Sequence, residues 1–160
     1  MMWVVRAGCG SVYYEKIIQE HRIYIPWEGF CMNLSEYKTR SEYKDLVQRE
    51  KKCENRTSIS TWAGQLFAFV WEIKIGDMVL IPSKASHTYC LARVTSDYTF
   101  EISDPEKLYH GRNIEIIKES TPKKALPQDL RYSLGAYRTI FRVKQEDRAL
   151  KAIEDYKEQK

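Results

Sequence analysis

Residues 58–82 read SISTWAGQLFAFVWEIKIGDMVLIP and decide the fold. Over residues 58–73 the apolar side chains fall largely on one broad face at helical spacing, which predicts an amphipathic helix covering a sheet. A tight turn follows at Gly76-Asp77, and the next apolar residues, 78–82, are continuous, which predicts a buried strand. This change of periodicity indicates a chain that mixes helices with strands.

Strand patterns also occur on both sides of this stretch. Further strands are predicted at residues 3–7, 22–26, 89–94, 98–102, 113–118 and 139–143. We expect the strand at 89–94 to run antiparallel to its predecessor. Because several strands are adjacent in sequence and the helices are few, we predict the α+β class, with a strongly bent β-sheet or small barrel flanked by helices.

The length of the chain predicts one domain. Its 160 residues lie within the usual range for a single domain. We assign residues 1–144 to this domain and residues 145–160 to a charged C-terminal helix or linker. The formal net charge is +4, and the segment 118–144 holds seven Lys/Arg against two acidic residues. Such a basic stretch favours contact with a polyanion, although a solvated surface explains many such runs.

Cysteine and histidine are scattered. The four cysteines (Cys9, Cys31, Cys53, Cys90) and three histidines (His21, His87, His110) form no zinc-ligand spacing. We therefore expect free thiols, no metal and no cofactor. No apolar run approaches the ~20 residues that span a bilayer, and no apolar leader follows Met1. We expect a cytoplasmic protein without a membrane partner.

The sequence contains only weak matches to catalytic motifs. Glu72-Ile73-Lys74 spells half of a metal-dependent nuclease signature, but it falls at the end of a predicted helix without a preceding strand Asp. No G-x-S-x-G elbow is present, and Gly8-Cys9-Gly10-Ser11 lacks the Gly-Lys-Ser/Thr ending of a phosphate loop. We predict no catalytic residue and a binding module rather than an enzyme.

Two tryptophans suggest a base pocket. Trp27 follows Pro26 at the exit of a predicted strand, and Trp62 lies beside the small residues Ala63 and Gly64. Each ring either packs in the core or stacks on a base, which contributes about 1–3 kcal/mol per base. An extruded base also needs polar groups at its edge. The predicted base pocket comprises Trp27, Trp62, Ser11, Glu28, Gln65, Arg6 and Tyr89, and the predicted phosphate contacts are Lys84, Arg93, Lys123, Lys124 and Arg138.

Several segments resemble a known group of modules. They are Trp3-x-Val5-Arg6-Ala7-Gly8-x-Gly10, Ile25-Pro26-Trp27, Ile59-x-x-Trp62-Ala63-Gly64-Gln65-Leu66-x-x-Phe69, Ile75-Gly76-Asp77-x-Val79 and Gln128-Asp129-Leu130-Arg131-x-Ser133-Leu134-Gly135. Together they resemble the PUA-like module at the N-terminus of Mrr-type restriction endonucleases. In the wider superfamily, which includes EVE, YTH and ASCH domains, the Trp-x-Gly segment of EVE domains is similar to Trp62-Ala63-Gly64.

The resemblance implies a fold and a function. The fold would be a bent β-barrel flanked by helices. The function would be to read a modified base in DNA, flipped into an aromatic pocket, as the specificity domain of a type IV restriction or phage-defence system. A nuclease or NTPase effector would be the partner. Two alternatives stay open, namely an RNA-binding PUA-like module and a protein-interaction or regulatory domain with structural tryptophans. DNA is the favoured nucleic acid.

Overall fold

One curled sheet of seven strands organises the computed structural model, which describes residues 1–52, 54–136 and 138–157. The strands are β1 (Met2–Val5), β2 (Arg22–Tyr24), β3 (Met78–Ser83), β4 (Thr88–Val94), β5 (Thr99–Phe100), β6 (His110–Pro122) and β7 (Ile140–Arg142). Their order is β2-β6-β4-β3-β1-β7, with β5 paired to β6. β1 is parallel to β3, and β3 and β4 are antiparallel as predicted. The α+β class with a strongly bent sheet is confirmed, and the sheet curls into a half-barrel.

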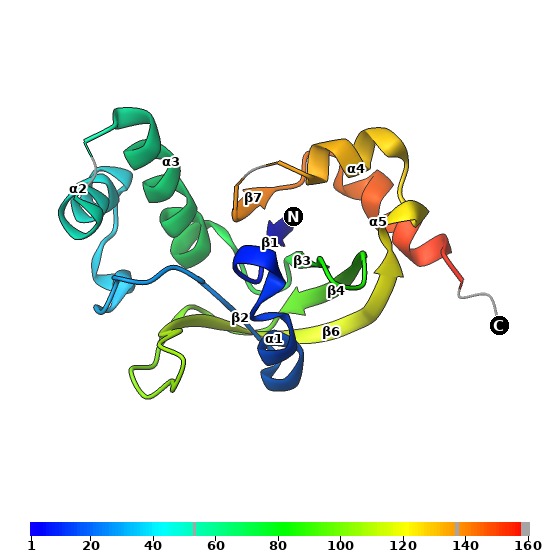
Figure 1. The fold of residues 1–160 in the computed structure, drawn as a ribbon, viewed down its shortest axis with the longest axis horizontal. Helices are drawn as coiled ribbons and strands as arrows, with labels where there is room; N and C mark the ends of the chain where they lie inside the picture. The colour runs from blue at the N-terminus through cyan, green and yellow to red at the C-terminus, as the bar shows by residue number, and fades with distance from the viewer. Residues whose placement is uncertain (53, 137, 158–160) are drawn as a thin grey trace.

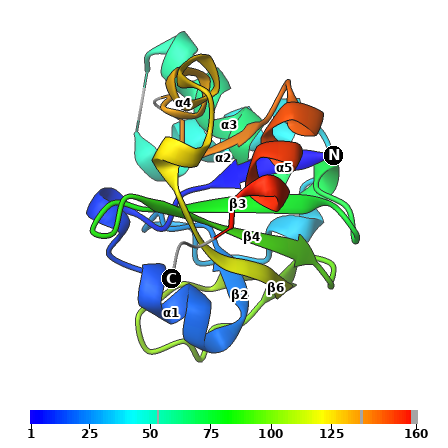
Figure 2. The ribbon, with the colours of Figure 1, turned by 90° about the vertical axis from the view of Figure 1, so that its right-hand side faces the viewer.

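Two groups of helices flank the sheet. The helices are α1 (Tyr14–Glu20), α2 (Arg40–Lys51), α3 (Arg56–Phe67), α4 (Gln128–Leu134) and α5 (Glu146–Asp155), with short turns η1 (Cys9–Ser11), η2 (Leu34–Glu36), η3 (Ala68–Glu72) and η4 (Lys123–Ala125). In Figure 1, α2 and α3 stand at one end of the molecule and α4 and α5 at the other. Figure 2 shows β3, β4 and the long β6 side by side. Within the described residues, no helix is both long and apolar enough to cross a bilayer.

The decisive stretch forms α3 and the π-helical turn η3. The Asn55 side chain caps α3 by accepting from the N–H of Ser58 (3.1 Å), and Ile59, Ala63 and Leu66 are buried, so the predicted apolar face is confirmed. The helix packs chiefly on α2 rather than across the sheet. At its end the fully buried Arg112 guanidinium donates to main-chain carbonyls of η3 and its flank. These carbonyls would otherwise lack partners.

The Gly76-Asp77 turn joins the helical part to the sheet. Gly76 has φ +95°, a conformation that favours glycine. The Asp77 carboxylate accepts from the N–H of Lys74 (2.9 Å), the indole N–H of Trp3 (3.1 Å) and the N-terminal ammonium of Met1 (3.2 Å). The predicted turn is therefore present, and its aspartate ties β1 to the start of β3.

The C-terminal part differs from its prediction in two ways. β6 extends through 13 residues, well past the predicted residues 113–118. Residues 145–160 were expected as a charged helix or linker, and α5 is a packed helix whose Ala149 and Ile153 are buried. Lys118 Nζ donates to the carbonyls of Ile153 and Tyr156 (both 2.6 Å). This contact explains why β6 carries a lysine where the chain meets α5.

Candidate functional site

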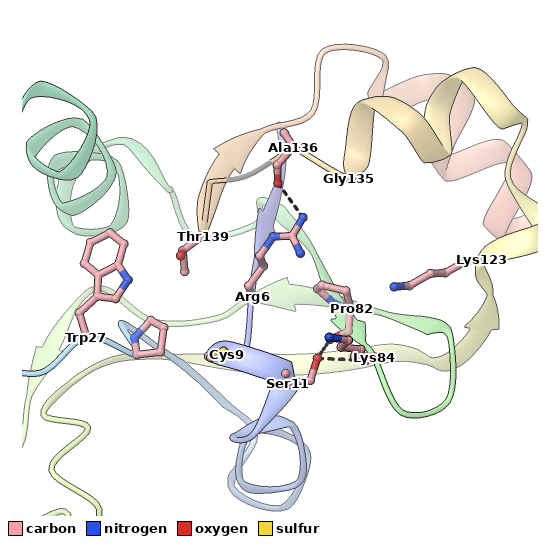
Figure 3. Close-up of a pocket in the computed structure, with 13 residues that line it drawn as sticks. Arg6, Cys9, Ser11, Trp27, Pro82, Lys84, Lys123, Gly135, Ala136 and Thr139 are labelled. Carbon is pink, nitrogen blue, oxygen red and sulfur yellow. Dashed lines mark hydrogen bonds between the residues drawn. The ribbon is translucent and has the colours of Figure 1, made fainter. Parts of the chain in front are cut away.

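A cavity of about 680 Å³ opens between the two helical groups. Its lining comes from five separate parts of the chain, namely the loop after β1, the segment after β2, the end of β3, the start of η4 and the segment before β7 (Figure 3). The lining residues are Arg6, Gly8, Cys9, Gly10, Ser11, Pro26, Trp27, Pro82, Lys84, Lys123, Gly135, Ala136 and Thr139. The volume lies within the range of about 300–1,000 Å³ that small-ligand sites occupy.

The loop of residues 8–11 forms one wall. Gly10 has φ +65°, and a Cβ atom added there would meet nothing within 4 Å, so the backbone faces open space. Ser11 Oγ donates to the carbonyl of Pro82 (3.2 Å) and accepts from the N–H of Lys84 (3.0 Å). Ser11 lines the cavity, and its hydroxyl fastens the loop to the end of β3.

Arg6 holds the opposite wall. Its guanidinium donates to the carbonyls of Ala136 (2.7 Å), Arg138 (3.0 Å) and Leu134 (3.3 Å). Figure 3 shows Arg6 in the middle of the site, pointing toward Ala136. Because all three acceptors are neutral carbonyls, the positive charge of Arg6 is retained beside the cavity.

The lining is cationic. Arg6, Lys84 and Lys123 line it, and no aspartate or glutamate does so within the described residues. Burial, and next the charge of Arg6, hold the pKa of the Lys123 ammonium below its usual value. When one cation disfavours the charged form of its neighbour, an anion bound between the two stabilises both charges. The cavity is thus suited to a negatively charged ligand.

Trp27 is the aromatic wall. In Figure 3 its indole nitrogen faces the cavity. The ring stacks on Trp62, with 5.5 Å between ring centroids and 14° between planes. Lys51 Nζ lies 5.1 Å from the ring centroid of Trp62. Two rings that hold a base between them need about 7 Å, twice the contact distance of stacked carbon atoms. The two rings therefore hold no base between them, and Trp62 supports Trp27 from outside the lining.

Three other predicted pocket residues also lie elsewhere. Gln65 Oε1 accepts from the N–H groups of Thr139 and Ile140 (both 2.9 Å), so this amide holds β7 instead of reading a base. Glu28 is exposed outside the lining, and its carbonyl accepts from the Lys51 ammonium. Tyr89 is buried in the sheet, where Lys123 Nζ lies 5.4 Å from its ring centroid. These three residues therefore lie outside the lining of the cavity, the Gln65 amide and the Tyr89 ring because the fold engages them and Glu28 because its side chain is exposed elsewhere.

The predicted phosphate contacts separate into two groups. Lys84 and Lys123 line the cavity, and Lys124 lines a hollow that adjoins it. Arg93 is exposed five residues along β4 from Thr88, about 17 Å at the rise of a strand. Arg138 lines a different hollow, between α3 and β7. The structure thus brings three of the five together and places Arg93 and Arg138 apart from them.

Sequence reasoning missed several lining residues. Cys9 is an exposed free thiol in the cavity wall, and Pro82, Ala136 and Thr139 complete the lining. Gly8, Gly10 and Gly135 stood out as glycines in the sequence, but their meeting at one place depends on strand pairing. Within the described residues, no group of three or more His, Cys, Asp or Glu side chains is arranged to hold a metal ion.

Comparison with known proteins gives a family and no function. The family of a domain of unknown function (DUF8426) matches residues 3–144. The chain belongs to this family. A search of curated proteins found no match. The matched range contains every residue that lines the cavity, so the site is part of the family's own domain.

Proposed function

We propose that this DUF8426 domain is a nucleic-acid recognition module, without catalysis of its own, whose cavity takes a single nucleotide. One observation carries the proposal. A nucleotide-sized cavity combines one aromatic wall, Trp27, with three cations, Arg6, Lys84 and Lys123, and its described lining holds no acid. Nucleotides pair a flat base with a phosphate, and these groups match a stacking ring and an ammonium.

The binding mode follows from the layout of the walls. The base lies against Trp27, whose other side is supported by Trp62, and the phosphate meets Lys84 and Lys123. A base within a duplex is not accessible to such a cavity, so the target is single-stranded or a base extruded from its stack. Stacking on one indole contributes about 1–3 kcal/mol, and the cations add a term that depends on salt.

The finer parts of the proposal rest on the resemblance to PUA-like modules. In that form the ligand is a modified base in DNA, the setting is a restriction or phage-defence system in the cytoplasm, and an effector nuclease or NTPase is the partner. An RNA ligand for the same cavity, or a protein partner with structural tryptophans, is an outcome that the test below separates.

Salt dependence tests the proposal. Fluorescence anisotropy with labelled oligonucleotides of DNA and RNA, with and without modified bases, measures affinity at several salt concentrations. With the two phosphate contacts of the cavity, Lys84 and Lys123, and a slope of about −0.7 for each, affinity for a single strand should fall at least about 7-fold between 50 and 200 mM salt. Lys84→Ala should reduce the slope by about 0.7, and the matched control Lys44→Ala, on the exposed side of α2, should not.

Each result that contradicts the proposal, or part of it, leads to a different conclusion. Absence of binding to every oligonucleotide, or binding that ignores salt, overturns the proposal and favours the protein-interaction domain. Tighter binding to RNA than to DNA of the same sequence assigns the cavity to the RNA-binding alternative. Selective binding of one modified base supports the finer, resemblance-based form.

A further inference from the structure

A second hollow adjoins the cavity. It has a volume of about 480 Å³ and lies where the β3–β4 turn, η4 and α4 meet. Its lining residues are Ser86, His87, Thr88, Pro122, Lys123, Lys124 and Arg131. Lys123 lines both spaces, so the hollow and the cavity lie on either side of this residue.

Hydrogen bonds build the hollow rather than leaving it as a gap between loops. The N–H of Lys123 donates to the carbonyl of His87 (2.9 Å), which joins η4 to the β3–β4 turn. The hydroxyl of Ser86 lies 2.7 Å from that of Thr88 and donates to that of Ser83 (2.9 Å). The floor therefore has a fixed backbone and carries hydroxyl groups, which are ligands for phosphate oxygens.

The cations of the hollow lack acidic partners. No described carboxylate lies within 4 Å of the side-chain nitrogens of Lys123, Lys124 or Arg131, whereas Arg148 pairs with Asp129 at 2.7 Å and Arg40 with Glu72 at 2.8 Å. A cation paired with a carboxylate has its charge largely compensated, whereas these three keep theirs for an external anion.

We propose that the second hollow binds the sugar-phosphate backbone of the nucleotide next to the one in the cavity. The strand then leaves the cavity past Lys123 and continues over Lys124 and Arg131. This inference rests on the proposed function, because it extends the ligand of the same site. It makes the minimal ligand a dinucleotide, and it gives the bound strand one direction of exit, toward α4.

A length series tests the inference. Calorimetric titration compares a deoxynucleoside monophosphate, a dinucleotide and a hexanucleotide for the unaltered chain and for the double variant Lys124→Ala/Arg131→Ala. Both side chains are exposed, so the fold should survive, and thermal melting checks this. The double variant should weaken the dinucleotide and hexanucleotide, reduce their salt slope by about 1.4, and leave the monophosphate unchanged. Arg93→Ala, an exposed arginine at the far end of β4, is the matched control and should change none of the three.

The failure of this inference differs from that of the proposed function. If Trp27→Ala weakens the hexanucleotide and the double variant binds all three ligands normally, the exit path is overturned and the cavity proposal stands. If Trp27→Ala, Lys84→Ala and the double variant all leave binding unchanged, both are overturned. Inorganic phosphate is the remaining arm. If the double variant loses binding of inorganic phosphate but binds the dinucleotide and hexanucleotide normally, the hollow is a free-anion site and the backbone path is overturned.

Discussion

Replacing Gln65 by methionine separates a structural role from a binding role. The sequence places Gln65 one helical turn after Trp62 and predicts that it reads a base edge. In the structure its Oε1 accepts from the N–H groups of Thr139 and Ile140, both at 2.9 Å, and its Nε2 donates to the carbonyl of Thr61 (3.2 Å). Methionine has a similar length and shape but offers only a weak acceptor, so it removes these bonds while keeping the volume.

The size of the effect follows from the two donors left behind. An unpaired buried donor destabilises a protein by about 1–3 kcal/mol. The N–H of Ile140 is buried and that of Thr139 is partly buried, so the second donor regains some contact with water. We expect Gln65→Met to lower the free energy of unfolding by about 2–4 kcal/mol. For a chain of this size that corresponds to a fall in Tm of about 4–16 °C.

Thermal melting followed by circular dichroism measures this change. Gln19→Met, an exposed glutamine on α1, is the matched control and should melt with the unaltered chain. The structural assignment of Gln65 is refuted if Gln65→Met melts like the unaltered chain and yet loses affinity for the oligonucleotide. That pair of results would restore the role predicted from the sequence.

Three further substitutions have defined outcomes. Trp62→Ala removes the stacking support of Trp27, and because Trp62 is half-buried the free energy of unfolding in urea should fall by about 2–3 kcal/mol. Trp27→Ala should in addition weaken oligonucleotide binding by about 1–3 kcal/mol. Equal binding of the oligonucleotide by both variants would contradict this. Arg112→Met leaves main-chain carbonyls of Phe69 and Ile73 unpaired and should lower stability by at least about 3 kcal/mol in the same assay. Burial lowers the pKa of His110 from its usual value of 6.5, so the unfolded chain takes up the proton first as pH falls. The contribution of His110 to stability is therefore fully present above about pH 6.5 and declines below it. A urea midpoint that stays constant as pH falls to 5 would contradict this.

The helical and strand periods explain how much of the fold the sequence predicts. The helical segment before the Gly76-Asp77 turn and the strand after it are present because apolar periodicity and turn residues are local signals. β6 was predicted too short because its second half carries the exposed residues Glu119 and Ser120, and its pairing with β4 shifts register near Leu91. A strand that is held by main-chain pairing and by α5, rather than by a continuous apolar face, leaves little trace in its side chains.

Prediction of the site from sequence was limited for a different reason. The excess of lysine and arginine after residue 118 pointed to Lys123 and Lys124, which lie together in η4 beside the two hollows. Arg93 and Arg138 have the same charge but lie elsewhere, because register and strand order decide which end of the sheet a residue reaches. For the same reason, the two tryptophans that we predict to share a base pocket stack directly on each other.

The walls of the cavity are held in place by residues for which the sequence predicts a role in binding a base. Gln65 fixes Thr139 at the start of β7, and Arg6 holds the carbonyls of Leu134, Ala136 and Arg138, so the segment before β7 is fastened from two sides. A cavity walled in this way exists before the ligand arrives, which reduces the ordering that binding requires. Arg6 contributes both charge and wall, so its substitution would alter binding and structure together. Lys84 and Lys123 contribute side-chain charge without making hydrogen bonds from their ammonium groups to the described walls. They are therefore the positions at which the charge of the cavity can be removed while its shape is kept.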